Sequence, residues 1–218
     1  MNKEQIILNT IDFVKETLEG AEGGHDWFHI ERVYKNALLI SENEKVDPFT
    51  VQLGALLHDI ADAKFYNGDE SIGPKKAREF LKKQYVDEDI IIHIENIILF
   101  ISYKSSLDAS EKFTSPELDV IQDADRLDAI GAIGIARCFN YGGFKNRSLY
   151  DPAIEPNLEM TKEQYKKSTA PTINHFYEKL LLLKDKMNTK TGQLLAKERH
   201  RYMEGFLQQF YEEWNGVK

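Results

Sequence analysis

Residues 53–60 of the chain read LGALLHDI and set a histidine–aspartate pair, His58-Asp59, inside an apolar stretch. A carboxylate forced into a helical interior is costly unless hydrogen bonds or a cation meet it. Two further groups of suitable chemistry are His29 upstream and Asp125 downstream. Two imidazoles and two carboxylates together would satisfy a divalent metal ion. The sequence therefore predicts that three distant stretches of chain converge on one metal site.

The apolar pattern on both sides of this stretch predicts helices almost throughout. Asp47 and Pro48 are typical of an N-cap and first-turn proline, and they predict the start of the helix that carries His58. Apolar residues recur every three or four positions over several stretches, near residues 6–18, 27–45, 53–58, 90–101, 129–136 and 194–210. Strand signals are almost absent. We expect an all-α fold, a single-domain helical bundle over residues 1–218, with Asp125 at the head of the small-residue helix near 129–136.

Composition excludes several classes of protein. The chain has 218 residues, of which 42% are hydrophobic, enough to fill a core. Its net charge of −8 has the wrong sign for binding nucleic acid or an anionic membrane. No apolar run approaches the ~20 residues that cross a bilayer, and Lys3, Glu4 and Asp12 interrupt the N-terminal apolar stretch where a secretory signal would need an uncharged one.

The single cysteine, Cys138, excludes a disulfide within the chain and a thiolate zinc cage. We therefore expect a cytoplasmic protein with neither nucleic-acid nor membrane partners.

Nitrogen and oxygen ligands without thiolate favour an octahedral ion that keeps positions open for water and substrate. One divalent metal ion is expected, manganese first, with magnesium, nickel or iron as alternatives. Each histidine taken singly is more often a satisfied core or surface group, so only the combination indicates a metal.

The ordered pattern of His29, His58-Asp59 and Asp125 resembles the HD superfamily of metal-dependent phosphohydrolases. The wider motifs resemble one bacterial subgroup that includes nucleoside triphosphate pyrophosphatases; they read GHDWFH (24–29), HDIAD (58–62), DRLDAIG (125–131) and YGG (141–143). The resemblance covers nearly the full chain. It implies a helical bundle in which His29, His58, Asp59 and Asp125 bind the metal.

The resemblance also implies a single metal ion. HD phosphodiesterases with two metals carry two further histidines between the HD pair and the last aspartate, whereas only His93 lies there in this chain. Asp62 is our candidate general base, because it follows His58 by four residues and shares its face if the helix continues. A solvated carboxylate at a helix end is the alternative. The position resembles that of a catalytic acid in the alarmone-hydrolase branch, but that branch's adjacent second acid is Ala63 here, which argues against alarmone substrates.

A phosphate substrate needs cationic partners in a chain with net charge −8. Lys64 follows the HD pair, Arg126 follows Asp125, and Lys104 lies at the end of the 90–101 helix. The predicted substrate contacts are Lys64, Lys104, Arg126, His25, Asp128 and Tyr141, the last as a ring that stacks on a base. Solvated cations and packed aromatics are the plainer alternatives. His25 becomes a metal ligand instead if it is helical together with His29. Residues 140–160 have no clear period and are predicted to form a long loop that acts as a lid or wall.

These observations predict metal-dependent hydrolysis of nucleotides. The most specific expectation is a (deoxy)nucleoside triphosphate pyrophosphohydrolase, in which a metal-activated water attacks and Asp62 takes the proton. One alternative is a 5′-nucleotidase or another phosphomonoesterase, which would use the same ligands. A second is a non-catalytic nucleotide-sensing protein. The sequence leaves the base, the sugar and the oligomeric state open.

Overall fold

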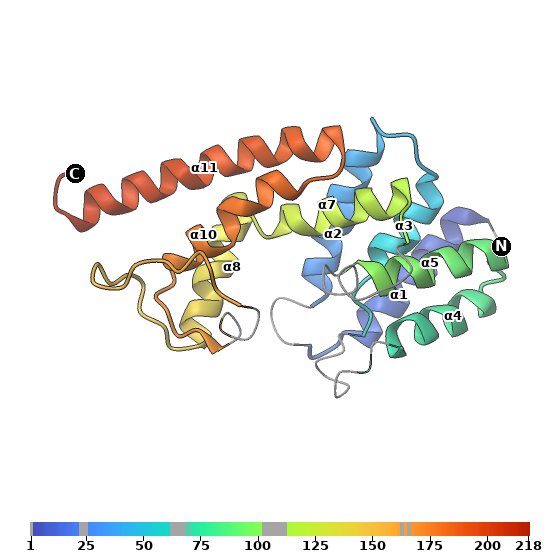
Figure 1. Ribbon diagram of the computed structural model, residues 1–218. Helices are drawn as coiled ribbons and strands as arrows, with labels where there is room; N and C mark the ends of the chain where they lie inside the picture. Colours follow the sequence, from blue (N-terminus) through green and yellow to red (C-terminus); the bar gives the residue numbers. More distant parts are fainter. Residues whose placement is uncertain are drawn as a thin grey trace. The chain divides into compact units, whose positions relative to one another are not determined.

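The computed structural model (Figure 1) describes residues 2–21, 26–61, 69, 71–101, 113–161, 164 and 167–218. Within these ranges no residue is in a β-strand, which confirms the predicted all-α class. The principal elements are α1 (Lys3–Thr17), α2 (Trp27–Ser41), α3 (Pro48–Leu57), α4 (Ile72–Lys83), α5 (Glu88–Phe100), α7 (Pro116–Asp128), α8 (Gly131–Phe144), α10 (Asn174–Glu178), the 3-10 helix η2 (Leu180–Lys186) and α11 (Lys190–Trp214). None of the helices in these ranges is long and apolar enough to cross a membrane.

The chain divides into two compact units, Met1–Asp125 and Arg126–Lys218. In the first unit α3 is the central helix and packs against α1, α2 and α5. Of its ten residues only Pro48 and Gln52 are not buried. A helix that is apolar on all sides is typical of a core position. The His58-Asp59 pair therefore follows directly on the most enclosed helix of the unit.

Two aspartates fix where α2 and α3 begin. The Asp47 carboxylate accepts hydrogen bonds from the amide of Thr50 (2.9 Å) and from its hydroxyl (2.6 Å), with Pro48 in the first turn. The Asp26 carboxylate accepts the amide hydrogen of His29 at 2.9 Å. Each bond satisfies an amide that has no partner within its helix. The N-cap predicted at Asp47 is confirmed, and Asp26 is the N-cap of α2.

The second unit has an aromatic core under α11. The rings of Phe139 on α8, Phe176 on α10 and Phe206 on α11 have centroids 5.8 to 6.0 Å apart. Gly131 begins α8 with a φ of +75°, and an ideal Cβ there would lie 3.0 Å from the side chain of Arg199. Only glycine accepts this conformation easily. The helical conformation is therefore interrupted between α7 and α8, just before Gly131.

The ends of α7 and α8 correct two expectations. Asp125 lies in the last turn of α7 and not at the head of the following helix, because the turn at Ala129 and Ile130 comes after it. The loop predicted over residues 140–160 begins later, since α8 continues to Phe144. Residues 150–152 and 154–156 of this loop line a cavity of about 400 Å³ within the second unit, together with Asn174, Tyr177 and Tyr211. The role of the loop as a lid or wall of an active site stays a prediction.

We predict that Asp47→Ala lowers the free energy of unfolding by about 1 kcal/mol at pH 7, because α3 loses its N-cap. Burial acts to raise the pKa of Asp47, but hydrogen bonds from Thr50, the charge of Lys3 and the amide of Phe49 outweigh it and hold the pKa below its ordinary value. The stabilisation is therefore present above about pH 4 and is lost as the pH falls through the lower folded-state pKa. Urea unfolding followed by circular dichroism at pH 7 and near pH 3 measures it. A difference from wild type that is the same at both pH values would contradict this account.

Candidate metal centre

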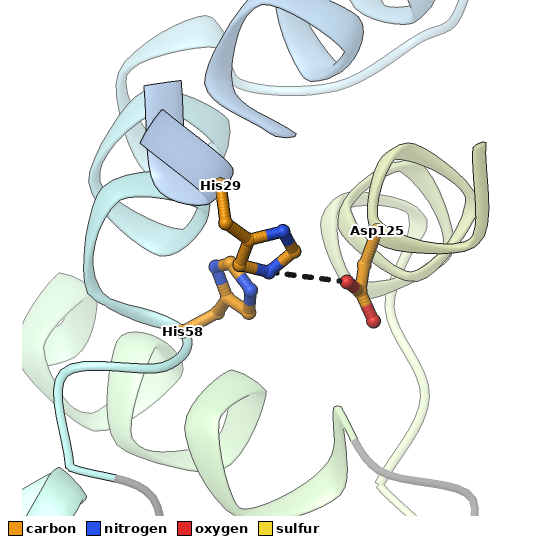
Figure 2. A group of neighbouring side chains, drawn as sticks. All are labelled: His29, His58 and Asp125. Atoms are coloured by element: carbon orange, nitrogen blue, oxygen red, sulfur yellow. Dashed lines mark ion pairs between the residues drawn. The ribbon is translucent and has the colours of Figure 1, made fainter. Parts of the chain in front are cut away.

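Three of the predicted ligands lie together in the first unit. Figure 2 shows His29, His58 and Asp125 pointing toward one another from α2, from the end of α3 and from α7. Each offers a ligand atom within 4.8 Å of those of the other two. The Nε2 atom of His29 lies 3.5 Å from Oδ1 of Asp125, and the two imidazole centroids are 5.5 Å apart.

His29 reaches this place because it lies on the buried face of α2. It is the third residue of the helix, and Val33 and Ala37 follow it at four-residue intervals on the same buried face. The cap from Asp26 is made to the amide of His29 itself, so the backbone that carries the imidazole is fixed at the start of the helix. The side chain is only 4% exposed.

His58 is held by the helix that it terminates. Its Nδ1 lies 2.8 Å from the carbonyl oxygen of Ala55. That carbonyl is among the last of α3, which have no amide partner within the helix. Because a carbonyl only accepts, Nδ1 carries a hydrogen, and Nε2 is the ring nitrogen left to face a metal ion. This backbone contact was not predicted, since a carbonyl acceptor leaves no mark in the sequence.

Asp125 supplies the open side of the centre. Its side chain is 42% exposed, whereas both histidines are buried. Bonds from a divalent ion to nitrogen or oxygen are about 2.0–2.2 Å long, so ligands on opposite sides of an ion lie about 4.2 Å apart. Ligand atoms within 4.8 Å of one another need only small adjustments to reach that arrangement. The three residues therefore fit a divalent ion that also keeps contact with solvent.

Asp59 is not part of this group, and its role as a fourth ligand stays a prediction. It is half-buried in the turn after α3. His58 has helical backbone angles (φ −57°, ψ −32°), and successive residues of a helix point about 100° apart. His58 and Asp59 therefore leave the helix in different directions.

The predicted general base, Asp62, lies outside the described residues, as do His25, Lys64 and Lys104. The roles predicted for these four residues stay predictions.

The remaining predicted substrate contacts belong to the second unit. The guanidinium of Arg126 donates to the carbonyl oxygen of Lys186 at 2.6 Å. Asp128 is 1% exposed and forms an ion pair with Arg137. Both residues thus have structural contacts, which sequence spacing did not indicate, and contact with substrate stays a prediction for each.

Tyr141 is the most open of the predicted substrate contacts on the second unit, with 48% of its surface exposed. The ammonium of Lys145 lies 5.6 Å from the centroid of its ring, and the guanidinium carbon of Arg147 lies 5.7 Å from it. Cations at this distance from an aromatic face are attracted to it. Stacking of Tyr141 on a base stays a prediction.

Comparison with known proteins shows which family the chain is similar to. The HD domain family model matches residues 27–130, a range that contains His29, His58, Asp59 and Asp125. The protein YpgQ of Bacillus subtilis is 35% identical over an alignment of 212 residues, and the match covers 94% of this chain and 92% of YpgQ.

Solved structures extend the comparison over the whole chain. The crystal structure of an HD-superfamily hydrolase from Bacillus thuringiensis has a TM-score of 0.79 and 45% identity, and the match covers 98% of this chain and 99% of that one. The crystal structure of Bacillus subtilis YpgQ in complex with ADP has a TM-score of 0.73 and 30% identity, with full coverage of both chains (100% each). The chain belongs to the HD superfamily of hydrolases.

Proposed function

We propose that the chain is a metal-dependent phosphohydrolase that acts on nucleotides, and most specifically that it converts a (deoxy)nucleoside triphosphate to a monophosphate and pyrophosphate. The observation that carries this proposal is the convergence of His29, His58 and Asp125 with the carboxylate side open to solvent. The complex of YpgQ with ADP supports a nucleotide as the ligand class. A cytoplasmic location and a single functional domain over both units belong to the same proposal.

One divalent ion, manganese in the first instance, would be held by His29, His58 and Asp125, with Asp59 as the fourth ligand. When bound, such an ion lowers the pKa of a coordinated water toward about 7 and polarises a phosphoryl oxygen. The hydrogen bond from Nδ1 of His58 to Ala55 fixes the tautomer in which Nε2 is the donor atom.

In the proposed reaction a water molecule attacks the α-phosphorus, and Asp62 takes a proton from it. The bond between the α-phosphorus and the bridging oxygen breaks, so that pyrophosphate leaves with the electron pair. Lys64, Lys104 and Arg126 are the cations proposed to meet the charge on the leaving group. No covalent intermediate with the protein is required.

We predict that His29→Ala, His58→Ala and Asp125→Ala each abolish manganese binding and lower turnover at least 10³-fold, because each removes one of only a few ligands. Isothermal titration calorimetry measures binding, and circular dichroism verifies the fold. His200→Ala is the matched control, since this imidazole lies 3.3 Å from Glu204 on its own helix, α11. Manganese-dependent turnover that persists in His58→Ala would disprove the metal assignment.

The position of attack determines which product receives the oxygen of water. With dATP in ¹⁸O-labelled water, we predict one labelled oxygen in dAMP and none in pyrophosphate, as read by mass spectrometry. Label in orthophosphate, released stepwise, would show a phosphomonoesterase or a nucleotidase instead. Tight nucleotide binding with manganese but no product after prolonged incubation would show a sensor.

We predict that Asp62→Asn lowers kcat by about 10²–10⁴-fold, because the proton acceptor is lost, while manganese affinity stays within about twofold. Steady-state kinetics and calorimetry separate the two effects. Asp69→Asn is the control, since the Asp69 carboxylate caps Ser71 in the same part of the chain. An unchanged kcat in Asp62→Asn would assign the proton transfer to another group.

A further inference from the structure

A glycine in the middle of α3 lies where a β-carbon has no room. An ideal Cβ on Gly54 would lie 2.4 Å from Cδ1 of Ile121 on α7 and 3.3 Å from Cδ1 of Ile97 on α5. Carbon atoms in ordinary contact are about 3.5–4.0 Å apart, so Cδ1 of Ile121 would have to move by about 1 Å and Cδ1 of Ile97 by a few tenths of an ångström. Both isoleucines are fully buried in a packed core, which leaves little space for rotation.

The register of the two helices connects this contact with the metal centre. Gly54 precedes His58 by four residues, and Ile121 precedes Asp125 by four residues. Residues four apart lie above one another on the same face of a helix. The close approach of Gly54 to Ile121 therefore lies one helical turn from the place where His58 meets Asp125.

We propose that Gly54 is a positioning residue of the metal centre, an inference that rests on the proposed function. The absence of a side chain at this position lets α7 approach α3 closely enough for Asp125 to reach His58 and His29. Glycine is a poor helix former, and an alanine at this position would favour the helix itself. Gly54 therefore permits the short distance between α3 and α7 and does not favour the formation of α3 itself.

A second contact holds α7 against the helix that carries the other histidine. The side-chain amide of Asn36 on α2 donates to the carbonyl oxygen of Ala124 at 3.2 Å. Asn36 follows His29 by two helical turns on the same helix, and Ala124 directly precedes Asp125. The structure assigns Asn36 the same positioning role toward α2 that Gly54 has toward α3.

Metal centres need ligands within about 0.5 Å of their productive positions. Part of the shift of about 1 Å forced on the buried Ile121 side chain would be passed to the backbone of α7, and a backbone shift of more than about 0.5 Å exceeds this tolerance. A helical core can absorb the same displacement with its helices intact. Loss of these contacts should therefore appear first in metal affinity and only second in folding.

The test is manganese affinity, measured by calorimetry on the full chain without substrate. Gly54→Ala should weaken manganese binding at least tenfold. Gly205→Ala on α11 is the matched control, because an ideal Cβ there meets nothing within 4 Å, and its affinity should stay within twofold of wild type. Ile121→Val removes the Cδ1 atom of the closest contact, so the double variant Gly54→Ala/Ile121→Val should recover most of the affinity. A cooperative thermal unfolding transition, followed by circular dichroism, verifies that each variant is folded.

Asn36→Ala should also weaken manganese binding at least tenfold. Gln52→Ala is its control, since Gln52 accepts a hydrogen bond from Tyr34 and so links α2 to α3. Unchanged affinity in Gly54→Ala, or a loss that Ile121→Val does not reduce, overturns the inference for Gly54, and unchanged affinity in Asn36→Ala overturns it for Asn36. A wild-type chain that binds no divalent metal overturns the proposed function itself, which is a different result from a wild type that binds and variants that bind equally well.

Discussion

Two buried imidazoles must lie within a few ångström of a carboxylate, and the packing of the first unit follows from this constraint. Burying a polar group is unfavourable unless a partner meets it. His58 meets the carbonyl of Ala55 through one ring nitrogen, and His29 meets Asp125 through Nε2. Because Nδ1 of His58 donates to the carbonyl of Ala55, Nε2 is the ring nitrogen that remains for the centre.

All three side chains come from helix ends. His29 lies in the first turn of α2, His58 directly follows α3, and Asp125 lies in the last turn of α7. A helix end can be buried on the side that packs against other helices and exposed to solvent on the other side. The centre is arranged in this way, because Asp125 is 42% exposed while both histidines are buried. The caps at Asp26 and Asp47 then matter beyond stability, because they fix the beginnings of the helices that carry the histidines.

The sequence could predict the parts of this arrangement that depend on residue type and local spacing. Helical periodicity, the cap at Asp47 and the chemistry of His29, His58 and Asp125 are all local signals. The position of Asp125 within its helix was not predictable, because the break after α7 depends on the left-handed Gly131 and its contact with Arg199. The ion pair of Asp128 with Arg137 is likewise visible only once the chain is folded.

Gly54 shows most clearly why spacing alone is insufficient. In the sequence it is one glycine among apolar residues, and nothing local distinguishes it from a tolerated weak point of the helix. Its meaning depends on Ile121, a residue far along the chain, and on the shared four-residue register with His58 and Asp125. If a metal ion binds as proposed, it joins α2, α3 and α7 and adds its binding free energy to the folded state, by about 2.7 kcal/mol at a free metal concentration 100 times Kd. The close packing that admits the ion and the ion itself then favour the same helix separation, so that metal affinity reports on the geometry of the core.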